Sequence, residues 1–368
     1  MNRIIMKRVL FIACLIAVGM TLHAQTKADQ IKHIRAVYAQ AKQKVDKMGQ
    51  DGKAAHTVHI RQKEMGAPGD EYTPETDTDT QFYFDRVGGN NDQGMAGKAV
   101  CYFVSVNWMA DGHTNYREYL FDPVKGHLLF AFMKAETHAG FKVETRYYYD
   151  AQGNCIEQKH KVQDQEATPD SHSWSDWKSE LECGCKYVRM FNLMLNTELP
   201  YPELASAHYP SNTPKAKLLK DIRAAYAKAK QKIAQNDKDG GLKNDIEITI
   251  HDQKLEDYPP VTTRWKCYYE QIQQPSPYQR YYFISEKTES MYGETYEEYL
   301  LDPKPGSENV IFIYNQGYAE GEEMEMRYYY DENGHCFESK VSDIVESEPV
   351  PARNKAGYIF SIFDELMQ

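Results

Sequence analysis

The stretch Glu144-Thr-Arg-Tyr-Tyr-Tyr-Asp-Ala-Gln-Gly-Asn-Cys155 decides the fold, because it returns 181 positions later as Glu325-Met-Arg-Tyr-Tyr-Tyr-Asp-Glu-Asn-Gly-His-Cys336. Eight of its twelve positions are identical. Each copy has an aromatic run, a glycine-containing turn and a second run of strand formers, which is the pattern of a β-hairpin. The chain is therefore expected to contain a duplication with a hairpin in each copy.

The duplication extends over most of the chain. A helical pattern around Ile34-Arg35-Ala36-Val37-Tyr38 recurs around Ile222-Arg223-Ala224-Ala225-Tyr226, and a strand ending in Asp122-Pro123 recurs at Asp302-Pro303. Short alternating or aromatic segments follow each helix, as in antiparallel sheets. The sequence thus predicts an α+β fold of two tandem homologous domains. Each has an N-terminal helix packed on a curved antiparallel β-meander and a short C-terminal helix.

Four segments follow from this division of the chain. We expect a signal peptide at 1–24, repeat domain 1 at 25–196, a proline-containing linker without periodicity at 197–213, and repeat domain 2 at 214–368. The order of helix and sheet resembles cystatin-like and nuclear-transport-factor-like folds. That resemblance is one of architecture only and implies no function.

The hairpin offers candidate binding residues. With a two-residue type I′ turn at Gln152-Gly153 and at Asn333-Gly334, one face of each hairpin is apolar and the other polar. The polar side chains of this face would form a recognition surface. The competing interpretation is that they are ordinary cross-strand pairs on a solvated sheet. The candidate residues are Arg146, Tyr148, Glu157, Arg327, Tyr329 and Glu338.

Glu118 and Glu298 are the candidates for acid chemistry, since they occupy equivalent positions on strands with apolar neighbours. A carboxyl group in such surroundings can have a raised pKa and act as an acid. The competing interpretation is a carboxylate satisfied by Arg or Tyr. No second carboxylate at a defined spacing supports a hydrolase.

Six cysteines follow the predicted signal peptide, and an even number in an exported chain first suggests disulfides. Cys155 and Cys336 occupy equivalent hairpin positions, so each is expected to bridge within its own domain. In the second domain Cys267 is the remaining cysteine with which Cys336 can pair, whereas three cysteines of the first domain are possible partners of Cys155. These are Cys101, Cys183 and Cys185. Unpaired thiols are the alternative, and the Cys183-Gly-Cys185 pair lacks the further ligands of a zinc site.

Charge and the N-terminus suggest where the protein works. Arg3, Lys7 and Arg8 precede an apolar run that ends near Ala24, as in a cleaved secretory signal peptide. We expect a periplasmic or extracellular protein, with lipidation at Cys14 the less favoured alternative. The formal net charge of −11 argues against nucleic acid and anionic membranes as partners, and no second apolar stretch is long enough to span a membrane.

No motif in the sequence identifies a reaction, a metal or a cofactor. The first hypothesis is a non-catalytic binding or interaction module of a bacterial cell envelope, with a protein, peptide or glycan ligand. The second is a hydrolase that uses Glu118 or Glu298. The third is a carrier of a small apolar ligand held between helix and sheet. The use of 28 tyrosines, most of them in predicted strands, fits both sugar stacking and plain sheet packing.

Overall fold

The computed structural model describes residues 26–50, 56–64, 76–89, 96–110, 113–137, 140–168, 176–196, 212–238, 245–254, 258–272, 278–304, 309–319, 322–341 and 349–367. The predicted signal peptide lies outside these ranges, as does the predicted linker apart from residues 212 and 213. The domain boundaries therefore stay a prediction. None of the helices in the described ranges is long and apolar enough to cross a membrane.

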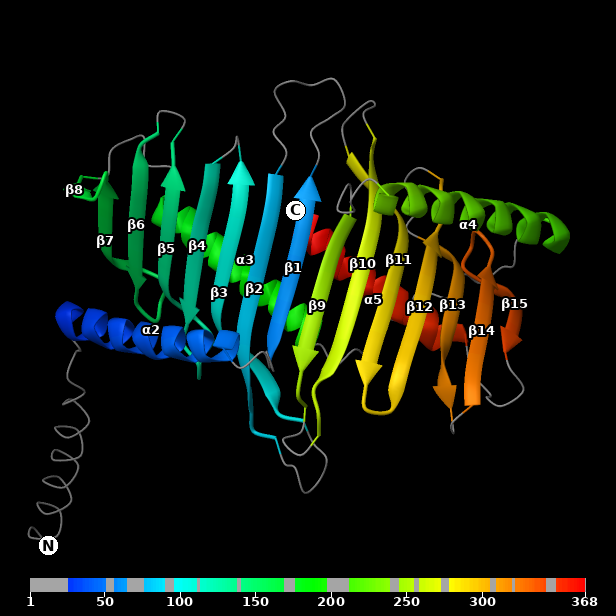
Figure 1. The fold of residues 1–368 in the computed structure, drawn as a ribbon, viewed down its shortest axis with the longest axis horizontal. Helices are drawn as coiled ribbons and strands as arrows, with labels where there is room; N and C mark the ends of the chain where they lie inside the picture. Colours follow the sequence, from blue (N-terminus) through cyan, green and yellow to red (C-terminus); the bar gives the residue numbers. More distant parts are fainter. Residues whose placement is uncertain are drawn as a thin grey trace, which may run out of the picture.

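The chain has an α+β fold in which fifteen strands form one antiparallel sheet with helices on both faces (Figure 1). The first half contains α2 (Lys27–Gln50), β1 (Thr57–Glu64), β2 (Thr76–Val87), β3 (Lys98–Ala110), β4 (His113–Phe121), β5 (Leu128–Glu136), β6 (Lys142–Tyr149), β7 (Cys155–Val162), β8 (Gln165–Ala167) and α3 (Trp177–Leu195). The second half contains α4 (Lys215–Lys238), β9 (Asp245–Asp252), β10 (Val261–Ile272), β11 (Tyr278–Ser290), β12 (Gly293–Leu301), β13 (Val310–Ala319), β14 (Glu322–Tyr330), β15 (Cys336–Val341) and α5 (Pro349–Met367).

The two halves meet edge to edge, because β1 pairs with β9 in antiparallel fashion. At the centre of this pair Ile60 faces Ile248, and these two residues occupy equivalent positions in the two copies. An antiparallel pair in which equivalent residues face each other has twofold symmetry. The halves are thus related by an approximate twofold axis through the sheet, and each presents the same face to the same side.

Helices cover both faces of the sheet. On the near face in Figure 1, α2 crosses the strands of the first half and α4 those of the second, while α3 and α5 lie behind the sheet. The near-face cores are separate: Ile34 of α2 packs with Phe103 and Leu120, and Ile222 of α4 packs with Phe283. Behind the sheet one continuous core spans both halves. Each fully buried aromatic side chain there contributes about 2–3 kcal/mol.

The expected strands are confirmed, and the structure adds the short β8. The predicted type I′ turn is wrong. Gly153 has a positive φ of 83° but Gln152 does not, and the N–H of Gly153 donates to the carbonyl of Asp150, as in a type I turn followed by a left-handed glycine. A bulge between Tyr148 and Tyr149 compensates for the longer loop, so Tyr148 lies opposite Glu157, as it would with the two-residue turn.

Two further expectations need correction. The C-terminal helices are not short: α3 and α5 each span 19 residues. Asp176 caps α3 by accepting hydrogen bonds from the N–H groups of Lys178 and Ser179. The first turns of this helix are polar, so the spacing of bulky residues does not show where the helix begins. The hairpin face predicted to be polar is also half core, since Tyr148 and Tyr329 are buried beneath α2 and α4.

An ion pair links the two halves beside the β1–β9 junction. Arg86 of β2 donates to both carboxylate oxygens of Asp252 on β9, with an Nε–Oδ1 distance of 3.0 Å. Burial by itself raises the pKa of Asp252, but the imidazole of His56, 3.6 Å away, and the hydrogen bonds from Arg86 outweigh it and lower that pKa below the ordinary value. The pair therefore stabilises the junction while Asp252 is ionised.

Replacing Asp252 with Asn should lower the free energy of unfolding by about 2–3 kcal/mol near neutral pH, because the buried guanidinium loses its anionic partner. A lowered carboxyl pKa contributes stability that is present above the unfolded-state value near 3.8 and disappears as the pH falls below it. The stability difference between wild type and Asp252→Asn, measured by urea unfolding, should therefore shrink as the pH falls below about 4. A difference that does not change with pH would contradict this account.

Candidate functional site

Two equivalent cavities open on the near face of the sheet, one in each half, where a helix crosses the hairpin strands. The first has a volume of about 280 Å³ and the second about 520 Å³. The residues of the first are Ile34, Arg35, Tyr38, Phe130, Phe132, Arg146 and Tyr148. Their counterparts in the second are Ile222, Arg223, Tyr226, Phe312, Tyr314, Arg327 and Tyr329, to which Glu298 is added.

An aromatic wall of the same geometry supports both cavities. Tyr38 meets Phe130 edge-on with ring centroids 5.1 Å apart, and Tyr226 meets Phe312 at the same distance. The next ring along the wall is also matched, since Phe130 lies 5.0 Å from Tyr148. In the second half Phe312 lies 5.0 Å from Tyr329. Edge-to-face ring packing at these distances is favourable and fixes the position of the phenol groups.

Two arginines lie at each cavity, one from the helix and one from the hairpin. Arg35 lies 5.6 Å from the ring centre of Tyr148, and Arg146 lies 5.3 Å from that of Phe132. Both have acidic neighbours, with Glu157 3.8 Å from Arg35 and Glu144 3.0 Å from Arg146. Positive and negative side chains therefore balance around the first cavity.

The second cavity keeps one of these two pairs and changes the other. Arg327 pairs with Glu325 on its own strand. Glu338, the counterpart of Glu157, pairs instead with Lys215 of α4. The hydrogen bond from Lys215 lowers the pKa of Glu338, and the positive charge of Arg223 acts in the same direction. Each predicted hairpin candidate thus lies in or beside a cavity.

Glu118 and Glu298 anchor the helices to the sheet. The Oε1 atom of Glu118 accepts from Lys42 at 2.9 Å and from Tyr116 at 2.5 Å, while Oε2 accepts from Tyr38 at 2.5 Å. Only 3% of the residue is exposed. Burial, and then the hydrogen bond to the carboxylate, raises the pKa of both tyrosines, so the phenols remain protonated donors.

The second half repeats this anchor. Glu298 accepts from Lys230 at 2.7 Å, from Tyr296 at 2.7 Å and from Tyr226. A carboxylate with three donors on its two oxygens is already satisfied, which is the competing interpretation given in the sequence analysis. This geometry favours a positioning role for Glu118 and Glu298 over general acid catalysis. In the described ranges no cluster of three or more His, Cys, Asp and Glu side chains could hold a metal ion.

Sequence reasoning missed the helical half of the site. Arg35, Tyr38 and Lys42 lie three and four residues apart on one face of α2, and the same three residue types recur on α4. Polar side chains that recur at helical spacing in both copies are a usable signal. In the structure Tyr38 and Lys42 both reach the buried Glu118.

The six cysteines in the described ranges are free thiols, so the structure contains none of the disulfides that the sequence allowed. Cys101 and Cys267 are buried in the core behind the sheet, and burial raises the pKa of both thiols. Cys155 and Cys336 each donate to the carbonyl oxygen two residues ahead, at 3.4 and 3.5 Å. Cys183 and Cys185 lie in α3.

Comparisons with known proteins leave the family open. No protein-family model matches the chain, and no curated protein matches its sequence. The geometry of the two cavities therefore carries the functional argument.

Replacing Glu298 with Gln should lower the free energy of unfolding by about 1–3 kcal/mol, because Lys230 and the two half-buried phenols of Tyr226 and Tyr296 lose a charged acceptor. Urea unfolding measures the effect. Glu325→Gln is the matched control, since Glu325 is 46% exposed and its pair with Arg327 should contribute less than about 1 kcal/mol. Equal losses in the two variants would refute the anchor role.

A count of thiols tests the cysteine assignment. The chain that follows the predicted signal peptide should react with six equivalents of a thiol reagent in guanidinium chloride without reductant, because all six cysteines are free. A count of four or two would show that disulfides form in the protein.

Proposed function

We propose that the protein is an exported, non-catalytic binding module that takes a sugar residue of a glycan at each of its two equivalent cavities. The observation that carries this proposal is the pair of cavities itself. Equivalent arginine and aromatic positions surround both, with one exchange of Phe132 for Tyr314. The ring spacings of the two walls agree within 0.1 Å.

The chemistry of the cavities suits sugars. Arg35, Arg146 and Tyr38 offer hydrogen-bonding groups at fixed angles, and the partly exposed ring of Phe132 offers an apolar surface beside them. Ligand sites combine such apolar walls with a few oriented polar groups. Because each arginine already has an acidic neighbour, the cavity carries no large excess of charge. A neutral polyhydroxylated ring therefore fits better than a strongly charged ligand.

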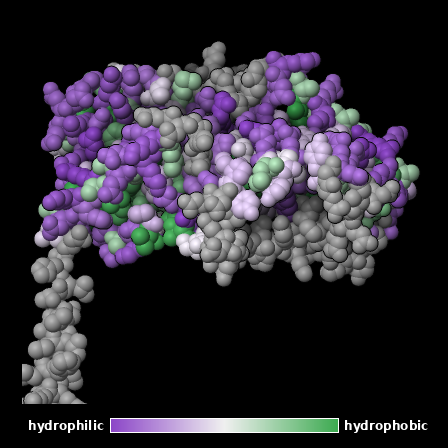
Figure 2. Space-filling model, turned by 60° about the horizontal axis from the view of Figure 1, so that its bottom comes forward, coloured by the Kyte–Doolittle hydropathy of each residue, from purple (hydrophilic) through white to green (hydrophobic). Residues whose placement is uncertain are grey.

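The surface outside the cavities supports a polar ligand. Figure 2 shows that hydrophilic residues make up most of the described surface in that view, with hydrophobic residues only in small groups. Large docking surfaces for proteins usually present a wider apolar patch. The formal net charge of −11 also disfavours nucleic acid and anionic lipid surfaces.

The duplication places the two cavities on the same side of the sheet, where one ligand could reach both. Because the twofold axis passes through the sheet, both cavities open on the near face in Figure 1. One polymer with repeated sugar units could occupy both, and the second binding event would then be intramolecular. Such avidity raises the overall affinity by roughly 10²–10⁴ without new contacts. The predicted signal peptide would deliver the protein to the cell envelope, where glycans are exposed.

A glycan array followed by calorimetry tests the proposal. The purified protein should bind one class of neutral oligosaccharide, with two sites per chain for the shortest ligand that binds. Arg146→Gln or Arg327→Gln should weaken one of these sites about tenfold, and the double variant should weaken both, because each loses one hydrogen-bonding guanidinium.

Arg61→Gln is the control, since Arg61 is exposed on β1 outside both cavities. Binding of peptides but not of glycans on a mixed array would reject the ligand class. Glycan binding that the double variant leaves unchanged would reject the site.

A further inference from the structure

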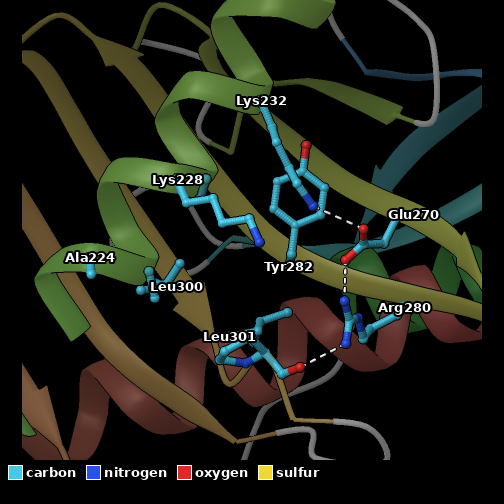
Figure 3. A pocket seen from close by; sticks show the side chains of 11 residues that line it. Ala224, Lys228, Lys232, Glu270, Arg280, Tyr282, Leu300 and Leu301 are labelled. Atoms are coloured by element: carbon cyan, nitrogen blue, oxygen red, sulfur yellow. Dashed lines mark hydrogen bonds and ion pairs between the residues drawn. The ribbon is translucent and has the colours of Figure 1, made fainter. Parts of the chain in front are cut away.

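A third cavity lies in the second half, between α4 and strands β10 to β12, on the other side of α4 from the sugar cavity (Figure 3). Its volume is about 260 Å³. Lys228 and Lys232 extend into it from α4, Glu270 and Arg280 approach from the strands, and Tyr282 forms a wall. Alanine and leucine side chains supply an apolar lining.

Positive charge exceeds negative charge in this cavity. Lys232 lies 2.9 Å from Glu270, and Arg280 pairs with the same carboxylate while donating to the Pro303 carbonyl at 2.7 Å. Burial opposes the ionisation of Glu270, but hydrogen bonds from Arg280 and Lys232 outweigh it and lower its pKa. The cavity therefore contains three cationic side chains, Lys228, Lys232 and Arg280, and one ionised carboxylate, that of Glu270.

Two of these groups retain hydrogen-bonding capacity toward a ligand. Lys228 makes no hydrogen bond or ion pair with another residue in the described part of the chain, and its side chain points into the cavity (Figure 3). The Nε atom of Arg280 is buried and has no hydrogen-bond partner within the same ranges. The terminal nitrogens of Arg280 carry four further N–H groups, of which the hydrogen bonds to Glu270 and Pro303 use two, so two donors remain for an anion.

The first half differs at the decisive positions. Lys228 corresponds to Gln40 on the equivalent helix, and Arg280 corresponds to Val100 on the equivalent strand. Ala225, which lines the cavity, corresponds to the larger Val37. The first two exchanges add two positive charges to the second half, and the third removes side-chain bulk from the lining of its cavity. The difference sets this cavity apart from the two sugar cavities, which both halves share.

We propose that this cavity is a separate binding site for a small organic anion, one with a carboxylate or sulfonate group on an aromatic or short apolar body. The anion would lie between Lys228 and Arg280. The body would pack against the ring of Tyr282 and the apolar lining. The volume is slightly below the roughly 300–1,000 Å³ of typical ligand pockets, which suits a single substituted ring.

Benzoate, with benzamide as its neutral counterpart, tests the proposal by ligand-observed NMR and calorimetry on the full chain. Benzoate should bind at one site per chain, and benzamide should bind at least about tenfold more weakly because it lacks the charge. Lys228→Gln, which restores the residue of the first half, should weaken benzoate binding about tenfold, and Ala225→Val should weaken it by filling the cavity.

Lys220→Gln is the matched control, because Lys220 is exposed on α4 outside the cavity and its replacement changes the net charge equally. Equal affinity for benzoate and benzamide, no benzoate binding at millimolar concentration, or unchanged binding by Lys228→Gln and Ala225→Val would each overturn the proposal. Glycan binding at the two equivalent cavities is measured separately in the same variants. A negative result for one ligand therefore does not decide the result for the other.

Discussion

The backbone pairing of β1 with β9 is the constraint on which the rest of the structure depends. Without it each half would expose an edge strand with unpaired N–H and C=O groups, which invites uncontrolled association. Because Ile60 faces its own counterpart Ile248, the pairing satisfies both edges at once and fixes a twofold relation. That relation makes the core behind the sheet continuous and turns the two equivalent cavities to one side.

On the near face, the buried carboxylates couple the helices to the cavities. Glu118 holds Tyr38 and Lys42 of α2 against the sheet, and Glu298 holds Tyr226 and Lys230 of α4 in the same way. A helix fixed at this point carries the neighbouring arginine to the cavity rim. The carboxylates thus support the walls of the cavities, since each accepts three hydrogen bonds.

The two halves carry opposite charges at one pair of equivalent strand positions behind the sheet. Behind the sheet Arg117 of β4 lies 3.4 Å from Glu180 of α3, whereas the equivalent strand position in the second half is Glu297, which lies 3.0 Å from Lys355 of α5. The sign of the charge on strand and helix is reversed. Packing α3 on the second half would bring like charges together in a buried site, so these pairs select the correct helix for each half.

The sequence by itself determined the duplication, the fold class, the strands and the hairpin register as far as Tyr148, because side-chain alternation and repeated segments can be read directly from the chain. Next to the turn a bulge shifts the pairing, so that Cys155 faces Tyr149. The sequence also pointed to Arg146, Tyr148, Arg327 and Tyr329, which the structure brings to cavities. Only the tertiary structure decided that Tyr148 is covered by α2, that Arg35 and Tyr38 complete the site, and that β1 meets β9. These features join residues far apart in the chain, and no local pattern encodes which helix face meets which sheet face.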